Sequence, residues 1–222
     1  MTSIVPKYQK LVQKRGDGQY YVRGTFTRNN LDFTADVEHL FDLGFQHVSA
    51  EPVVAPDEAD YSLREQDLPK LYAEYEKLAV KLLEEDDPKR DFFHFKIDLK
   101  QGPCVIKRMG GCGSGNEYVA VTPDGDIYPC HQFVGMEEYR MGSVHTGELN
   151  RELKERFSKL NVYSKPECRA CWAKFYCSGG CNANNLQYGG DLMTPYKIGC
   201  ALEKKRVECA IMIAAAKQLK ED

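Results

Sequence analysis

Nine cysteines are the residues of this 222-residue chain whose type and spacing could do chemistry. Four of them follow the pattern C-x2-C-x5-C-x3-C, at Cys168, Cys171, Cys177 and Cys181. A C-x2-C pair places two sulfurs on one tight turn, where both can bind the same metal site. These four thiols alone could therefore hold either one zinc ion or one iron–sulfur cluster.

Four further cysteines raise the predicted number of clusters. Cys104, Cys112 and Cys130 lie upstream of the dense group, and Cys200 lies downstream. The eight cysteines make two sets of four, and one [4Fe–4S] cluster needs four thiolates. We therefore predict two such clusters. The ninth cysteine, Cys209, falls within a predicted helix, where a thiol usually packs as a small hydrophobic residue.

Disulfide bonds are the alternative use of these thiols. They need an oxidising compartment, and the first residues of the chain lack the apolar stretch of a secretory signal. An odd number of cysteines would also leave one thiol over. The sequence therefore favours metal binding and a cytoplasmic location.

Composition excludes two classes of partner. No apolar run approaches the ~20 residues that cross a bilayer. The formal net charge of −3 gives no case for the basic face that nucleic-acid binding needs. We expect neither a membrane nor a nucleic acid as partner.

The first hundred residues alternate predicted strands and helices. Strands are expected at 20–27, 46–54 and 92–97, where β-branched and aromatic residues gather. One helix is expected from Thr34, as N-cap, to Gly44. A second, capped by Asp67, carries a buried stripe at helical spacing, made of Leu71, Tyr75, Leu78 and Leu82. This alternation is typical of parallel βαβ units. Three strands and two helices do not close a barrel, so the first strand should present an unpaired edge.

The character of the sequence changes after about residue 100. A turn at Pro123, Asp124 and Gly125 predicts a hairpin whose second strand ends at Cys130. Helices are expected at 148–160 and 201–220. The predicted divisions are 1–100, 101–200 and a C-terminal helix at 201–222.

The cysteine pattern resembles that of a known family. Cys112-x12-Gly125-x4-Cys130, then the dense group, then Cys200, is similar to the seven-cysteine motif of SPASM domains. Those domains follow radical S-adenosylmethionine (SAM) barrels and hold auxiliary [4Fe–4S] clusters. The resemblance implies an α/β protein: the C-terminal half of a partial (β/α) radical SAM barrel at 1–100, then a small Cys-rich SPASM domain with short hairpins and helices at 101–200.

A closer resemblance concerns the substrate. The segments 22–27 (VRGTFT), 125–132 (GDIYPCHQ) and 177–181 (CSGGC) look like those of SCIFF-peptide maturases. Those enzymes form thioether crosslinks in a ribosomally made Cys-rich peptide. Anaerobic sulfatase maturases have an aspartate at the place of His131, which counts against their reaction. The alternatives are another SPASM peptide-modifying enzyme, a sulfatase-maturase-like enzyme, or a non-enzymatic zinc-binding module with four cysteine ligands.

The resemblance also implies roles for single residues. It assigns the first auxiliary cluster to Cys104, Cys112, Cys130 and Cys181, and the second to Cys168, Cys171, Cys177 and Cys200. Cys104 stands outside the seven-cysteine motif, and some relatives leave that corner open. Arg23, Thr25 and Glu51 would lie on the SAM side of the barrel, although a plain barrel-interior role serves Arg23 and Thr25 as well. His131 would exchange protons with the substrate or make a structural hydrogen bond.

Radical SAM enzymes carry a CxxxCxxC loop, and no cysteine precedes Cys104 here. We therefore expect a C-terminal fragment that is inactive and aggregation-prone alone. SAM and a third [4Fe–4S] cluster would be found only in the complete enzyme. The implied partners are the Cys-rich precursor peptide, the missing N-terminal half of the barrel, and an electron donor such as a flavodoxin or ferredoxin.

Overall fold

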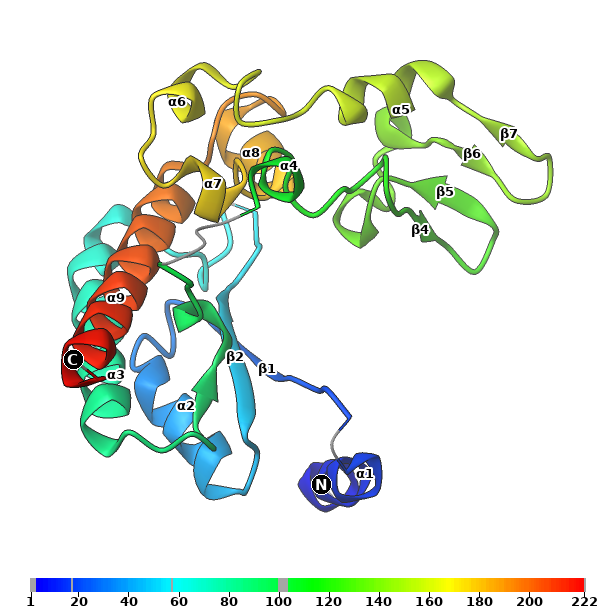
Figure 1. Cartoon of the computed structure of the whole chain (residues 1–222). Helices are drawn as coiled ribbons and strands as arrows, with labels where there is room; N and C mark the ends of the chain where they lie inside the picture. The colour runs from blue at the N-terminus through cyan, green and yellow to red at the C-terminus, as the bar shows by residue number, and fades with distance from the viewer. Residues whose placement is uncertain (1–2, 17, 57, 100–103, 222) are drawn as a thin grey trace. The chain divides into compact units, whose positions relative to one another are not determined.

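The computed structural model describes residues 3–16, 18–56, 58–99 and 104–221. The chain divides into two compact units. Unit 1 is Met1–Gly102 together with Ala201–Asp222, and unit 2 is Pro103–Cys200. Each unit contains its own sheet, with the elements labelled in Figure 1.

Unit 1 is built on a three-stranded parallel sheet. Its strands are β1 (Val22–Phe26), β2 (His47–Pro52) and β3 (Asp91–Phe92), in the order β1-β2-β3. Val22 pairs with Val48, and His47 pairs with Asp91. The predicted parallel βαβ arrangement is therefore confirmed. Within this sheet β1 and β3 are the edge strands.

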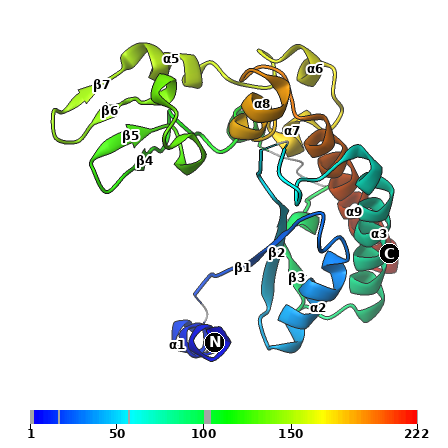
Figure 2. The same cartoon turned by 180° about the vertical axis from the view of Figure 1, so that it is seen from behind.

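The helices of unit 1 lie before, between and after these strands in the sequence. They are α1 (Val5–Arg15), α2 (Phe33–Asp42), α3 (Leu68–Glu85) and most of α9 (Lys197–Glu221), with 3-10 turns η1 (Glu65–Asp67) and η2 (Phe93–Phe95). The rings of Phe26 and Phe33 stack at 4.7 Å, and Tyr75 lies 4.7 Å from Phe33. Leu71, Tyr75 and Leu78 are fully buried, as their spacing predicted. Helices α3 and α9 lie side by side in both views (Figures 1 and 2).

Two local expectations for unit 1 are wrong. Thr34 is not an N-cap, because α2 already begins at Phe33 and the Thr34 hydroxyl donates to the Glu74 carbonyl at 2.9 Å. The strand expected at 92–97 stops at Phe92, where η2 begins. A 3-10 turn brings residues three apart onto one face, and the rings of Phe92 and Phe95 pack at 4.9 Å.

Unit 2 contains a small antiparallel sheet and short helices. The strands are β4 (Ala120–Val121), β5 (Asp126–Tyr128), β6 (Gly142–Ser143) and β7 (Glu148–Leu149), in that order. The helical elements are α4 (Val105–Arg108), η3 (His131–Phe133), η4 (Glu137–Tyr139), α5 (Arg151–Ser158), α6 (Pro166–Arg169), α7 (Lys174–Cys177) and α8 (Asn182–Gly189).

The predicted hairpin in unit 2 is confirmed. Gly125 has φ +83° in the turn between β4 and β5, and Cys130 follows β5 by two residues. The helix expected at 148–160 is shorter than predicted, because Glu148 and Leu149 pair with β6 and α5 begins at Arg151. The core of this unit includes Tyr128, Cys130, Phe133, Tyr139, Met141, Leu153 and Phe157.

Candidate metal centres

Hydrogen bonds between distant segments of unit 2 bring three cysteine-bearing segments together. The Gly115 amide donates to the Pro129 carbonyl at 2.9 Å, which places the segment after Cys112 beside Cys130. The Asn182 side chain donates to Ser114 Oγ at 3.2 Å and ties the segment after Cys181 to the segment after Cys112. Cys112, Cys130 and Cys181 are three of the four cysteines assigned to the first cluster.

Electrostatic interactions also link these three thiols. Burial raises the pKa of Cys130, and the charges of Cys181 and Cys112 raise it further. Burial also raises the pKa of Cys181, again with a contribution from Cys112. Tyr118 lies in the same group: its hydroxyl donates to Cys112 Sγ at 3.7 Å, and burial and the three thiols raise its pKa.

A second group of thiols surrounds Lys165. Cys168 and Cys171 lie on one tight turn, closed by the Cys171 amide donating to the Cys168 carbonyl at 3.0 Å. The charges of Cys168, Cys177 and Cys200 all act on Lys165, as does that of Cys181. Among the four cysteines assigned to the second cluster, Cys171 thus shares a turn with Cys168. The other three, like Cys181, lie close enough to Lys165 for their charges to act on it.

The turn between Cys177 and Cys181 needs a special backbone. Ser178, Gly179 and Gly180 have φ values of +60°, +86° and +75°, three left-handed residues in succession. Such values cost an ordinary residue free energy but not glycine. Gly111 passes close to this turn, since a Cβ added there would lie 3.3 Å from the Gly180 carbonyl oxygen. The backbone before Cys112 therefore runs directly against the turn that leads to Cys181.

The other residues singled out in the sequence lie in different settings. Cys104 is exposed at the N-cap of α4, and α4 packs against α7. His131 is exposed at the start of η3, and its Nε2 lies 3.1 Å from the side-chain amide nitrogen (Nε2) of Gln132. Cys209 is 4% exposed and belongs to unit 1, where burial raises its pKa to about 11.

Two features are absent from the described residues. No three His, Cys, Asp or Glu side chains converge closely enough to hold a single metal ion. None of the described helices combines the length and apolar character that crossing a membrane demands.

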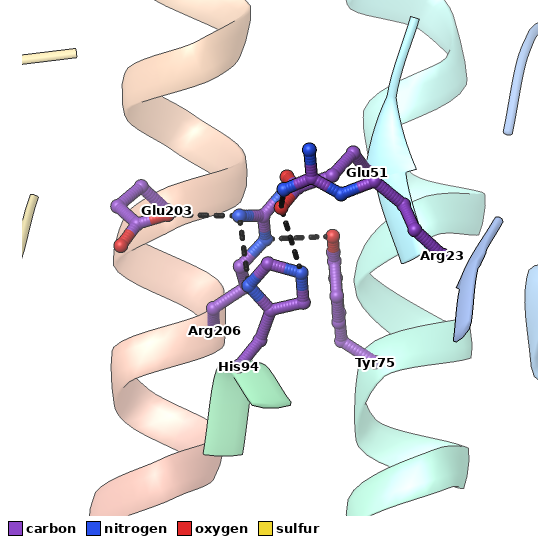
Figure 3. A network of polar contacts seen from close by, with 6 residues as sticks. All are labelled: Arg23, Glu51, Tyr75, His94, Glu203 and Arg206. Atoms are coloured by element: carbon purple, nitrogen blue, oxygen red, sulfur yellow. Dashed lines mark hydrogen bonds and ion pairs between the residues drawn. The ribbon is translucent and has the colours of Figure 1, made fainter. Parts of the chain in front are cut away.

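Unit 1 holds a polar network at the carboxyl end of β2, shown in Figure 3. Arg23 and Thr25 are both exposed on β1, and Thr25 pairs with Glu51 in the register. Glu51 Oε1 lies 3.0 Å from Arg23 Nη2 and 3.2 Å from His94 Nε2. Its other oxygen lies 3.5 Å from Arg206 Nη2.

Arg206 organises the buried side of this network. It comes from α9, is 7% exposed, and donates from Nε to the Tyr75 hydroxyl at 2.9 Å. It also pairs with Glu203 at 3.1 Å and approaches His94 Nδ1 at 3.4 Å. An arginine can only donate, so His94 Nδ1 must accept and His94 is neutral here.

The network keeps Glu51 ionised. Burial raises its pKa, but the contact with His94 and the charges of Arg206 and Arg23 outweigh burial and lower the pKa to about 2. Burial and the charge of Arg206 lower the pKa of His94, which agrees with a neutral ring. Glu51 is therefore a fixed anion whose partner Arg23 has a side chain that is 64% exposed.

Arg206, His94 and Lys165 were not predicted from the sequence. Arg206 could have been found, because it stands four residues after Leu202 and four before Ala210 on the buried face of α9. An arginine inside such an apolar stripe predicts a buried anionic partner. Neither His94 nor Lys165 has a comparable signal in the sequence.

One family of known proteins matches part of unit 2. Residues 112–172 match the model of the SPASM family, an iron–sulfur cluster-binding domain. A 99-residue stretch is 35% identical to an uncharacterised protein of Archaeoglobus fulgidus, covering 42% of this chain and 23% of that protein.

Solved structures of anSMEcpe share the fold. With bound AdoMet, the TM-score is 0.68 at 19% identity, over 96% of this chain and 58% of that one. With bound AdoMet and the Kp18Cys peptide, the TM-score is 0.65 at 18% identity, over 96% and 61%. The chain thus spans about three fifths of those structures and about a quarter of the archaeal protein. Residues 112–172 are thus similar to a SPASM iron–sulfur cluster-binding domain, and the chain shares its fold with the matched part of anSMEcpe.

Proposed function

We propose that this chain is the auxiliary-cluster part of a radical SAM enzyme that forms thioether crosslinks in a ribosomally made Cys-rich peptide. The observation that carries the proposal is the gathering of the motif cysteines of unit 2 into two groups. The charges of Cys112 and Cys181 help to raise the pKa of Cys130, and that of Cys112 helps to raise the pKa of Cys181, whereas the charges of Cys168, Cys177, Cys181 and Cys200 act on Lys165. Cys181 interacts with Cys112 and Cys130, which lie upstream of it in sequence, and this supports the interleaved assignment that the SPASM resemblance implies.

Two [4Fe–4S] clusters fit this donor set. Thiolates are the usual ligands of such clusters, and each cluster needs four. Cys104 would complete the first set from the N-cap of α4, and Cys171 completes the second through its turn with Cys168. When bound, such clusters supply one-electron transfer. The protein's part is to hold the thiolates and to set the local charge and solvent access.

Unit 1 would contribute to the SAM side. Thr25 and Glu51 lie near the carboxyl ends of β1 and β2, which is the edge where active sites of (β/α) barrels gather, and Arg23, two residues before Thr25, reaches Glu51 at 3.0 Å. Glu51 is already neutralised by Arg206 from the buried side, so the exposed Arg23 can bind an anionic group without leaving Glu51 unpaired. His131, beside Cys130, remains the proposed proton-exchanging residue.

Metal analysis of the anaerobically reconstituted chain tests the cluster proposal. We expect about eight irons and eight sulfides per chain, because eight thiolates satisfy two cubane clusters. About four of each would mean that one cluster forms. Stoichiometric zinc without sulfide would overturn the proposal in favour of a zinc module.

Mass spectrometry tests the reaction. A longer homologue that also contains the CxxxCxxC loop is supplied with SAM, reduced flavodoxin or ferredoxin, and candidate Cys-rich peptides. Thioether closure removes two hydrogens and consumes one free thiol. A loss of two hydrogens with all thiols retained would instead indicate a carbon–carbon link or an oxidised side chain.

A further inference from the structure

Lys165 is a buried cation in the middle of unit 2. Its side chain is 2% exposed, and among the described residues of that unit no other Lys, Arg, Asp or Glu is classed as buried. Burying a charge is costly unless it is paired and hydrogen-bonded. The position of Lys165 therefore needs a compensating anion.

Two hydrogen bonds fix the ammonium group between the two cysteine sets. Nζ donates to the Gly179 carbonyl at 2.8 Å and lies 3.3 Å from Asn182 Oδ1. Gly179 stands between Cys177 and Cys181, which belong to different sets. The Asn182 amide in turn holds Ser114, on the segment that follows Cys112.

Both hydrogen-bond partners of Lys165 are neutral, so its counter-charge must come from elsewhere. Burial lowers the pKa of Lys165, and the thiolates of Cys168, Cys177, Cys181 and Cys200 oppose that shift. These four cysteines include members of both sets.

We propose that Lys165 is a positioning residue that offsets the negative charge of both cysteine sets and makes reduction of the clusters they bind more favourable. The inference rests on the proposed function, since it requires the clusters. Adding an electron makes a thiolate-bound cluster more negative. A fixed positive charge in a low-dielectric interior stabilises that reduced state.

Redox titration of the reconstituted full chain, followed by electron paramagnetic resonance, tests this role. The variants are Lys165→Met and Lys165→Gln, which remove the charge, and Lys165→Arg, which keeps it. Lys159→Met is the matched control, because it removes the same charge from a side chain of unit 2 that is 72% exposed.

We expect Lys165→Met to lower the ratio of reduced to oxidised cluster at least tenfold at a fixed potential, equivalent to about 59 mV for one electron. Lys165→Gln should give the same shift, although it can still donate one hydrogen bond. Lys165→Arg and Lys159→Met should titrate like the unmodified chain.

A structural role alone would give a different result. If Lys165→Met and Lys165→Gln bind their iron and titrate like Lys159→Met, the inference is wrong. Loss of iron from these two but not from Lys165→Arg would support the need for charge. Loss of iron from all three variants would overturn the inference. The hydrogen bonds made by the Lys165 ammonium group, and not its charge, would then be what iron binding requires. Failure of the proposed function is distinguishable, since the unmodified chain itself would then take up no iron and sulfide.

Discussion

Two buried cations, Lys165 and Arg206, lie in different units and face different anions. Arg206 meets the carboxylates of Glu51 and Glu203 and the Tyr75 hydroxyl, all within unit 1. Lys165 meets carbonyl and amide oxygens and lies among thiols. A buried charge that loses its partner is strongly destabilising. A substitution should therefore lower the stability of the chain most at the anionic partner of each buried cation.

Replacing Glu51 by glutamine should destabilise unit 1. The folded-state pKa of Glu51 is about 2, against an ordinary value of 4.5. That difference corresponds to roughly 3 kcal/mol of stability at pH 7. We expect Glu51→Gln to lose about this amount in urea unfolding followed by circular dichroism. Arg23→Gln is the control: its side chain is 64% exposed, so its loss should cost less than about 1 kcal/mol.

The same substitution should change the response to acid. A lowered carboxyl pKa gives stability that is complete above pH 4.5 and is lost as pH falls toward 2. The pKa of His94 is also lowered from its ordinary value of 6.5. The protein therefore loses further stability below pH 6.5, because the unfolded state then binds the proton more tightly than the folded state does. Unmodified protein and Glu51→Gln should therefore converge in stability between pH 4.5 and 2. A constant difference across that range would contradict this account.

Iron content should separate Cys209 from the motif cysteines. Cys209 is buried in unit 1, whereas Cys177 is in unit 2. We expect Cys209→Ala to keep about eight irons and Cys177→Ala to lose about four, measured after anaerobic reconstitution. A loss of about four irons from Cys209→Ala would show that Cys209 is a ligand.

The small sheet of unit 2 is the element that leads the chain to Cys130. Its strands are two or three residues long, so few ladder hydrogen bonds hold it. Two glycines illustrate how differently its backbone is constrained. A Cβ on Gly142, with φ +149°, would lie 2.0 Å from the Glu148 carbonyl oxygen. A Cβ on Gly147, with φ +69°, would meet nothing within 4 Å.

Alanine at these two positions should therefore have unequal effects. Gly147→Ala carries only the conformational cost of a left-handed residue, about 1 kcal/mol. Gly142→Ala must also separate β6 from β7, and we expect a loss of about 3 kcal/mol or more. Trp172, the single tryptophan, lies in unit 2 and can report urea unfolding of the cluster-free chain by fluorescence. Equal losses would mean that the β6–β7 pair contributes little.

At the scale of the whole molecule, the two units differ in what holds them together. Unit 1 has a sheet covered by helices that bury Phe26, Phe33, Leu71 and Tyr75. The cysteine-bearing loops of unit 2 instead rely on turns, on single hydrogen bonds and, in our proposal, on clusters. Metal binding of that kind contributes directly to folding free energy.

Removing the clusters should therefore loosen one unit far more than the other. After chelation of the reconstituted chain, we expect hydrogen exchange to accelerate at the amides of 104–200. The amides of α2 and α3 should keep their protection, because their core contains no proposed ligand. Uniform acceleration in both units would show that the clusters stabilise the chain as a whole.

Much of unit 1 could be predicted, because local patterns determine it. The spacing of Leu71, Tyr75 and Leu78 indicates the buried face of α3, and the alternation of elements indicates a parallel sheet. Side chains joined across long stretches could not be predicted: Arg206 and Tyr75 are 131 residues apart, and Asn182 and Ser114 are 68 apart. The grouping of the cysteines came from a family resemblance, since spacing along the chain does not say which thiols meet in space.

The 131-residue separation between Tyr75 and Arg206 has a consequence for synthesis on the ribosome. A domain usually folds once its chain has emerged, and the N-terminal one folds first, but unit 1 is interrupted by the whole of unit 2. At translation rates of roughly 5 to 20 residues per second, Tyr75 waits roughly 7 to 26 s for Arg206. All eight cysteines assigned to the clusters precede Arg206 in the chain, so the buried arginine of unit 1 is synthesised after every proposed ligand of unit 2.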